Sequence, residues 1–237
     1  MIGKERLLEA MTAALRGADG DEAELVVMGG REDLSRCAGS VVHQNVSVEN
    51  SQAVARVVRG KRVGCASTRG TTPAALERAL DDAAELARFV PEDEQFPGLP
   101  GPAPVPGVRS HVPETAAVSP EARADELEAV FRVAAAHGLT VAGAYATREQ
   151  ELAVANTRGV ALHAPLTSAS VNLVALGENS SGYACAASRD VRDLELRNLA
   201  DTAVRKCVDG ARPIAIEPGH YEVILEPAAM AELMEWM

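Results

Sequence analysis

Histidine is the side chain best suited to serve as a metal ligand or general base near neutral pH, and the chain has five, spread widely along its length. They are His43, His111, His137, His163 and His220. A zinc peptidase site of the H-E-x-x-H type places two histidines one helical turn apart beside a carboxylate, and none of the five has such a neighbour. No G-x-S-x-G, P-loop or G-x-G-x-x-G pattern is present either. We therefore assign no catalytic, cofactor-binding or metal-ligating residue in this chain.

The remaining reactive groups also have structural interpretations. Paired carboxylates at Asp81–Asp82 and at 92–94 fall on a predicted helix surface and in a loop, where charges are normally solvated. The cysteines are widely spaced and form no C-x-x-C pair, so we expect four small buried hydrophobic residues in a reducing, cytoplasmic compartment. They are Cys37, Cys65, Cys185 and Cys207.

Composition narrows the possible partners. The chain has 237 residues, 47% of them hydrophobic, and a formal net charge of −11. A negative field repels phosphate backbones, which disfavours direct nucleic-acid binding. No run of apolar residues is long enough to span a membrane, and the mixed charges of residues 1–17 do not fit a signal peptide.

The elements of the first half follow from periodicity. Lys4–Arg16 is predicted to be an amphipathic helix, and a second helix begins at Thr72–Pro73, with Thr as N-cap and Pro in the first turn. Four short strands are expected between them, with Asn50–Ser51 and Gly60–Lys61 as turns. They span Glu24–Met28, Gly39–Val46, Ala53–Arg59 and Arg62–Ser67.

The same order returns after a segment rich in proline and glycine, residues 91–118, which we expect to be an extended linker without regular structure. A helix capped by Ser119–Pro120 runs to His137, and a last helix covers Asp193–Val208. Five short strands are expected between them. They span Thr140–Thr147, Glu151–Asn156, Val160–His163, Ala169–Leu176 and Gly182–Ala187.

The two halves match at an offset of about 120 residues, which predicts an internal duplication. Matched pairs include Leu7 with Leu127, Arg69 with Arg189, and Ala83 with Ala203, while Gly64 falls on Gly182 after small length changes. His43 and His163 also match, which favours a shared structural role. We predict an α+β fold of two tandem helix–antiparallel sheet–helix units, with a sheet in each half. The units are residues 1–90 and 119–217, joined by the linker 91–118.

Two features of the predicted sheets bear on function. Gly64 and Gly182 lie inside hairpin strands, where glycine indicates a bulge or a close backbone approach. Polar residues such as Ser168, Ser170 and Asn172 share one sheet face, which is either a binding surface or simply the solvated side.

Particular segments resemble the TldD/PmbA family, and the likeness covers nearly the whole chain. They are the stretches 42–45, 60–68, 96–100, 154–160, 181–183 and 218–227, which read VHQN, GKRVGCAST, FPGLP, VANTRGV, SGY and PGHYEVILEP. The resemblance implies a cytoplasmic metallopeptidase or its non-catalytic partner, working as a dimer on peptides and unfolded segments. An older description of the family is as modulators of DNA gyrase.

The chain departs from the catalytic pattern of that family. Catalytic members carry a zinc-binding H-E-x-x-x-H helix soon after the segment that resembles 221–227, and here no such helix begins. This favours the PmbA/TldE-like, metal-free partner type, so we expect no cofactor in this chain and no activity from it alone. Residues 218–237 read as the start of a truncated C-terminal domain, with an apolar helix left uncovered.

The resemblance therefore implies the N-terminal region of a peptide-processing system, serving dimerisation and peptide guidance. Its partners would be a second copy or a related TldD-like subunit, and an extended or unfolded peptide. The alternative is a non-enzymatic interaction module that modulates a partner such as DNA gyrase.

Overall fold

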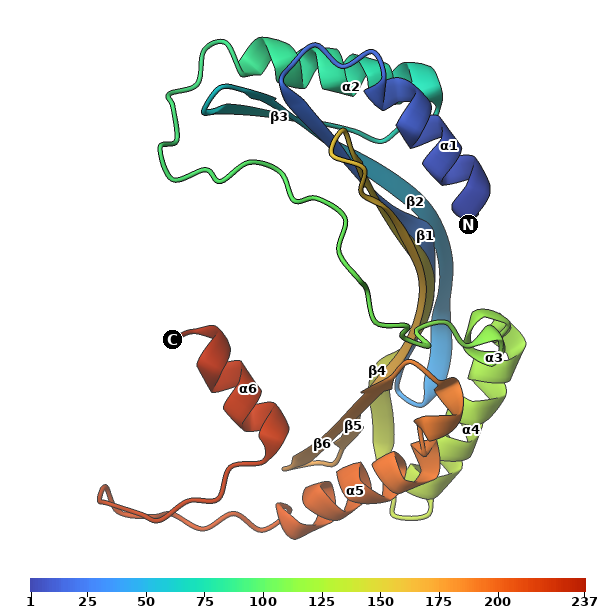
Figure 1. Cartoon of the computed structure of the whole chain (residues 1–237). Helices are drawn as coiled ribbons and strands as arrows, with labels where there is room; N and C mark the ends of the chain where they lie inside the picture. The colour runs from blue at the N-terminus through green and yellow to red at the C-terminus, as the bar shows by residue number, and fades with distance from the viewer.

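The computed structural model describes residues 1–237, and its centre is one strongly curved six-stranded antiparallel sheet (Figure 1). The strand order is β3-β2-β1-β4-β5-β6. The strands are β1 Glu22–Ala38, β2 Val41–Arg59, β3 Arg62–Thr68, β4 Thr140–Asn156, β5 Ala161–Leu176 and β6 Ser181–Ser188.

Helices cover the convex side of the sheet in two separate groups (Figure 1). α1 and α2 pack on the end formed by β1–β3, and α4 and α5 pack on the end formed by β4–β6. The helices are α1 Lys4–Leu15, α2 Pro73–Leu86, α3 Pro113–Ala116, α4 Pro120–Ala135, α5 Leu196–Asp209 and α6 Pro227–Glu235, with a 3-10 turn at Val191–Asp193. None of these helices combines the length and the apolar character needed to cross a membrane.

The predicted strands are correct in position but wrong in length. The expected strands Gly39–Val46 and Ala53–Arg59 are joined in β2, which runs straight through Asn50–Ser51, and Glu24–Met28 continues through Gly29–Gly30 to Ala38 as β1. The predicted turn at Gly60–Lys61 is confirmed, between β2 and β3. The centre of each long strand lies between the two helix groups, where no helix requires an apolar face. Polar residues and glycines are therefore tolerated there, and in sequence they resemble turns.

The expectation of a separate sheet in each half also needs correction, because the two units share one sheet. β1 pairs antiparallel with β4 from Glu24↔Asn156 to Cys37↔Gly143. The two hydrophobic cores cross the same boundary. Ala153 and Ala155 of β4 belong to the core under α1 and α2, while Cys37 of β1 belongs to the core under α4 and α5.

The internal duplication is visible at two matched glycines. A Cβ added to Gly64 would lie 2.0 Å from the Ala83 carbonyl oxygen of α2, and one added to Gly182 would lie 1.9 Å from the Ala203 carbonyl oxygen of α5. In both halves a helix therefore packs directly on the backbone of the short outer strand. This confirms the close approach that glycine indicated at these positions.

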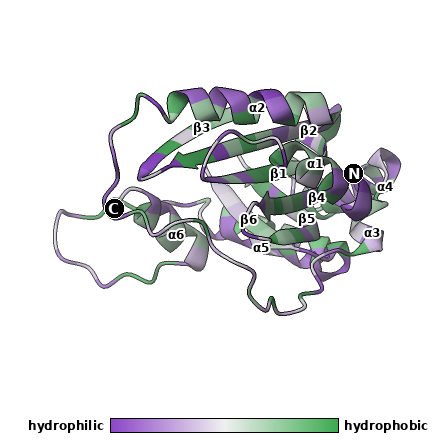
Figure 2. Ribbon diagram, turned by 45° about the horizontal axis from the view of Figure 1, so that its top comes forward, coloured by the Kyte–Doolittle hydropathy of each residue, from purple (hydrophilic) through white to green (hydrophobic).

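The helix caps agree with the sequence. The Thr72 side chain accepts a hydrogen bond from the Ala75 N–H, and the Ser119 side chain accepts one from the Ala122 N–H at 3.1 Å. The apolar face of α2 is buried as expected. It comprises Leu76, Ala79, Leu80, Ala83 and Ala84, continued by Ala87 just past the helix end. Figure 2 shows this alternation of hydrophobic and hydrophilic residues along α2.

We expect Ser119→Ala to lower the free energy of unfolding by about 1 kcal/mol, because the substitution leaves an N-terminal amide of α4 without its side-chain acceptor. Urea denaturation measures this change. Ser119→Asp should recover most of the loss, because the carboxylate restores an acceptor and its negative charge interacts favourably with the positive N-terminal end of the helix dipole. An alanine variant as stable as the wild type would show that this cap contributes nothing.

The segment 91–118 is extended and irregular for most of its length, but it is anchored and contains the short helix α3. Leu99 is buried, and its N–H donates to Glu22 Oε2 at 2.6 Å. That bond, together with one from Arg158, holds the pKa of the Glu22 carboxyl below its usual range. Further along, Asn156 Nδ2 donates to the Pro100 carbonyl oxygen. The segment is thus fixed to the ends of β1 and β4.

The expectation of four buried cysteines is half wrong. Cys37 and Cys207 are buried, and burial raises the pKa of the Cys37 thiol. Cys65 and Cys185 are exposed. Cys65 lies on β3 and Cys185 on β6. Strand alternation directs both side chains to the sheet face that the helices do not cover.

Candidate functional site

The concave face of the sheet carries a trough of about 620 Å³ at the junction of β1, β2 and β3. Only two of its 13 lining residues, Met28 and Val48, are hydrophobic. The others include Gly30, Glu32, Asn50, Gln52, Ser67 and Gln150. A polar, open trough of this kind suits an extended hydrogen-bonding ligand better than a compact apolar one.

Two glycines give the trough its floor. Gly29 and Gly30 lie in the middle of β1, and Gly30 has a φ of +155°. A Cβ added to Gly30 would lie 2.2 Å from the Glu149 carbonyl oxygen of β4. The backbones of β1 and β4 therefore approach closely at this point, and no side chain of Gly30 fills the space above them.

The outer edge of β2 is free beside this trough. β3 pairs only with Ala53–Arg59, so β2 from Val41 to Gln52 has a neighbour on one side alone. At the point where β3 ends, the Ser51 hydroxyl donates to the Arg69 carbonyl oxygen at 2.9 Å. Beyond that bond the edge is open, and most side chains between Val41 and Gln52 are exposed.

The corresponding edge in the second unit is covered. β6 pairs only with Ala169–Leu176, and the segment preceding α3 lies beside Pro165–Thr167 of β5, next to the end of β6. The Thr167 N–H donates to the Ser110 carbonyl oxygen at 3.0 Å, and the Val112 N–H donates to Thr167 Oγ1 at 3.0 Å. The Ser110 hydroxyl in turn donates to the Pro165 carbonyl oxygen. An extended segment of the chain thus satisfies the part of this edge at Pro165–Thr167.

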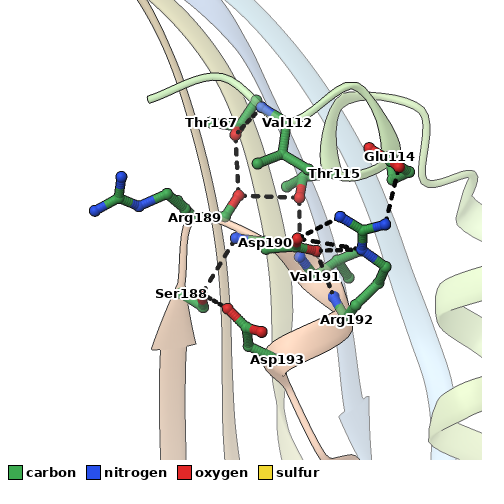
Figure 3. A network of polar contacts seen from close by, with 10 residues as sticks. All are labelled: Val112, Glu114, Thr115, Thr167, Ser188, Arg189, Asp190, Val191, Arg192 and Asp193. Carbon is green, nitrogen blue, oxygen red and sulfur yellow. Dashed lines mark hydrogen bonds and ion pairs between the residues drawn. The ribbon is translucent and has the colours of Figure 1, made fainter. Parts of the chain in front are cut away.

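Figure 3 shows the clamp that fixes this segment at the end of β6. The Arg189 carbonyl oxygen accepts from the hydroxyls of Thr167 and Thr115, at 2.9 and 3.0 Å. Next to it, Arg192 bridges Asp190 and Glu114. Hydrogen bonds from Arg192 lower the pKa of Asp190 to about 2, so this carboxylate stays charged at any physiological pH. The clamp ties α3, and with it the segment that precedes α3, to the end of β6.

At the other end of the concave face, Tyr183 and Cys185 are exposed neighbours on β6. A hydrogen bond with Cys185, aided by partial burial, raises the pKa of Tyr183 to about 12. This phenol is therefore neutral at physiological pH and can donate a hydrogen bond, but no base is placed to activate it. Neither residue forms a catalytic constellation.

The structure brings two histidines to carboxylates, and both pairs escaped the sequence analysis. His163 Nε2 lies 3.0 Å from Glu151 Oε2, and His111 Nε2 lies 2.9 Å from Glu149 Oε1. The matched position His43 is exposed on the free edge of β2, so the shared structural role expected for His43 and His163 is wrong. His137 and His220 are also exposed.

These pairs do not fit the zinc ion that the resemblance associates with catalytic relatives. No group of three or more His, Cys, Asp or Glu side chains is placed to hold a metal ion. Both oxygens of Glu151 are already occupied, by His163 and by the N–H groups of Ile2 and Gly3. Structural zinc takes four ligands and catalytic zinc three, so a His–Glu pair alone falls short.

The trough and the free edge were not predicted from sequence, because they depend on which strands pair. Alternation along the strand is the signal that could have found them: on β2, Ala53, Ala55 and Val57 are buried under the helices, while Val54 and Arg56 face the other way. Extending that alternation back through Asn50 and Val48 would have revealed a single long strand with an uncovered end.

Comparison with known proteins places this architecture in a family. Residues 23–87 match the model of domain 1 of the PmbA/TldA metallopeptidases, and residues 113–210 match the model of their central domain. The two matches together cover more than half of the chain; the first lies within the predicted unit 1–90, and the second begins inside the predicted linker and continues to residue 210. No curated protein matches the chain.

Three solved structures share the fold. TldE from Thermococcus kodakarensis aligns with a TM-score of 0.78 and 21% identity, over 84% of this chain and 47% of its own. A "putative modulator of a DNA gyrase" from Thermotoga maritima gives 0.71 and 16%, over 86% and 47%. A "putative modulator of DNA gyrase" from Bacteroides thetaiotaomicron gives 0.73 and 17%, over 88% and 50%.

This chain spans about half the length of each of those structures. At such identities the alignments establish the fold, while the family models identify the sequence. The order of domain 1, linker and central domain agrees with the segments whose resemblance was noted in the sequence. The chain belongs to the PmbA/TldD family.

Proposed function

We propose that this chain is the N-terminal region of a TldD/PmbA-type metallopeptidase-family protein involved in peptide processing, and that its own role is to guide an extended peptide. The polar trough on the uncovered concave face is the observation that carries the proposal. Hydrogen-bonding groups along an open sheet can hold a peptide through its main chain, independently of its sequence.

The chain supplies binding rather than bond cleavage in this proposal. Zinc in catalytic relatives would belong to other parts of those proteins, since the His and Glu side chains here form closed pairs. We expect the isolated 237-residue chain to show no zinc-dependent cleavage of a fluorogenic unfolded substrate. Turnover that a chelator abolishes would contradict this.

Dimerisation is the second part of the proposed role, with a second copy or a related TldD-like subunit as partner. Free exposed thiols on Cys65 and Cys185 support a reducing, cytoplasmic setting, because exposed cysteines in an oxidising compartment are prone to cross-linking. The net charge of −11 argues against nucleic acid as a direct ligand. Co-purification of the tagged chain with a related subunit would test the assembly.

Peptide guidance predicts saturable binding of an unfolded polypeptide. The probe is reduced, carboxymethylated α-lactalbumin carrying a fluorophore, titrated with the chain and followed by anisotropy. Native α-lactalbumin with its disulfides intact serves as the control, because it presents no extended segment. Binding of the unfolded form alone is the expected result. Equal anisotropy changes with both forms, or none with either, would overturn the proposal.

A second candidate function is a non-enzymatic interaction module. The observation in its favour is that two structural neighbours are named putative modulators of DNA gyrase. A supercoiling assay with purified gyrase distinguishes the two functions, because an interaction module would alter supercoiling at stoichiometric amounts whereas a peptide guide would leave it unchanged.

A further inference from the structure

The main-chain groups of β2 that point away from the sheet can be identified from the hydrogen bonds of β1. The Ala23 carbonyl oxygen accepts a hydrogen bond from the Thr157 N–H, and the Ala23 N–H donates to the Thr157 hydroxyl. Thr157 directly follows β4, so both groups of Ala23 point toward β4. The main-chain N–H and C=O groups of odd-numbered β1 residues therefore point toward β4, and those of even-numbered β1 residues point toward β2. There they bond with even-numbered β2 residues; Glu24, for example, pairs with Arg56. The odd-numbered residues of β2 direct their N–H and C=O groups outward.

These outward groups have two different environments along β2. From Ala53 to Arg59 they face β3, which pairs with all of that stretch. Before it, Asn45, Ser47, Glu49 and Ser51 face no strand. Side chains on both faces of this part of β2 are largely exposed, because it lies in the gap between the two helix groups. An open row of alternating donors and acceptors is a template for another strand.

The second unit shows what such an edge accepts in this fold. There the odd-numbered residues of β5 point outward, since the Thr167 N–H leaves the sheet to reach Ser110. Beyond the end of β6, an extended segment of the chain, Arg109–Val112, occupies the edge and bonds Pro165, Thr167 and Arg189. In the first unit no segment of the chain occupies the equivalent position, beyond the end of β3 and next to Arg69.

The trough adds room for side chains at that vacant place. Val48 and Asn50 of β2 line the trough on the concave face, beside the open edge. A strand added there would direct alternate side chains toward its polar wall. Arg31, Glu32 and Arg69 contribute opposite charges to the lining, so main-chain hydrogen bonding rather than net charge would dominate binding.

We propose that an extended segment of an unfolded polypeptide adds to the sheet along Asn45–Ser51 of β2, in line with the end of β3. This rests on the proposed function of peptide guidance and assigns it to one edge. The occupant is a peptide whose main chain is free to pair and whose trough-facing side chains are small or polar.

The experiment replaces Glu49 by proline. Proline removes the outward N–H at this position and leaves the inward-facing ladder to β1 intact, just as Pro165 is already accommodated on β5. The matched control is Val105→Pro, in the exposed linker between Pro104 and Pro106. We expect Glu49→Pro to weaken binding of carboxymethylated α-lactalbumin by about tenfold or more, and Val105→Pro to leave it unchanged.

Amide hydrogen exchange supplies the second measurement and also checks that each variant is folded. In the wild type, the peptide should protect the amides of Asn45, Ser47 and Glu49 and leave those of Gln44 and Val48 as they were, because only odd-numbered amides point outward. If folded Glu49→Pro binds the unfolded polypeptide with wild-type affinity, and the wild type shows no alternating protection, the edge assignment is overturned while peptide guidance stands. If the wild type binds no unfolded polypeptide, the proposed function itself fails. If Glu49→Pro instead converts a dimer to a monomer, the edge joins two copies and the assignment is also wrong.

Discussion

Replacing Gly64 by alanine is expected to destabilise the protein by at least about 3 kcal/mol, at the upper end of what overpacking normally produces. The new Cβ would lie 2.0 Å from the Ala83 carbonyl oxygen and 2.5 Å from the Ala87 nitrogen. Both are backbone atoms of the α2 region, so no side-chain rotation relieves the contact and the helix must move away from β3. The loss of chain entropy that disfavours glycine is only about 0.5–1 kcal/mol and acts in the opposite direction, so the clash dominates.

Gly182→Ala provides an independent repeat of this experiment within the same chain. Its Cβ would lie 1.9 Å from the Ala203 carbonyl oxygen and 2.6 Å from the Cys207 nitrogen, so the loss should be similar. Gly101→Ala and Gly107→Ala are the controls, because nothing lies within 4 Å of either new Cβ. Urea denaturation gives all four values. Full stability in Gly64→Ala or Gly182→Ala would contradict the helix–strand contact.

The helices were predictable because each element carries its own signal. Proline at the first helical position, Thr72 and Ser119 as caps, and an apolar stripe on α2 together fix where a helix begins and which face it buries. Glycine at matched hairpin positions also indicated the close approach of helix and strand. Each of these features follows from local geometry, which a sequence records directly.

The single sheet and its open edge were not predictable in the same way. Gly29–Gly30 and Asn50–Ser51 resemble turns in sequence, and only the pairing of β1 with β4 shows that the chain continues straight through them. The two His–Glu pairs also depend on tertiary contacts, because His163 of β5 reaches Glu151 of β4, while His111 and Glu149 are 38 residues apart and join the linker to β4. A pattern read along one chain segment contains no record of its neighbours in space.

The N-terminus of α1 is held by a buried carboxylate of the other unit. Glu151 of β4 is 1% exposed, and it accepts hydrogen bonds from the N–H groups of Ile2 and Gly3 and from His163. Burial alone would raise the pKa of Glu151. The hydrogen bonds from His163, Ile2 and Gly3 outweigh burial and hold the pKa below its usual value. The ionised carboxylate is thus the form that joins the two units.

We expect Glu151→Ala to lower the free energy of unfolding by about 3–5 kcal/mol, because it leaves two backbone donors and a buried imidazole without an acceptor. Glu149→Ala is the matched control. Glu149 lies two residues from Glu151 and pairs with His111, and both side chains of that pair are about one-fifth exposed. Glu149→Ala should therefore lower the free energy of unfolding by no more than about 1 kcal/mol. Equal losses in the two variants would show that burial does not set the strength of these pairs.

The same carboxylate predicts how stability depends on pH. Because the pKa of Glu151 is lower in the folded chain than the value of about 4.3 expected in the unfolded chain, ionisation stabilises the fold at and above that pH. The contribution is lost as the pH falls through the folded-state pKa. Glu151→Gln keeps the shape and one acceptor oxygen but cannot ionise. Urea denaturation between pH 6 and pH 3 should therefore show a steeper loss of stability in the wild type than in Glu151→Gln. The two curves of unfolding free energy against pH should converge at the acidic end. Parallel curves would mean that the ionised carboxylate does not join α1 to β4.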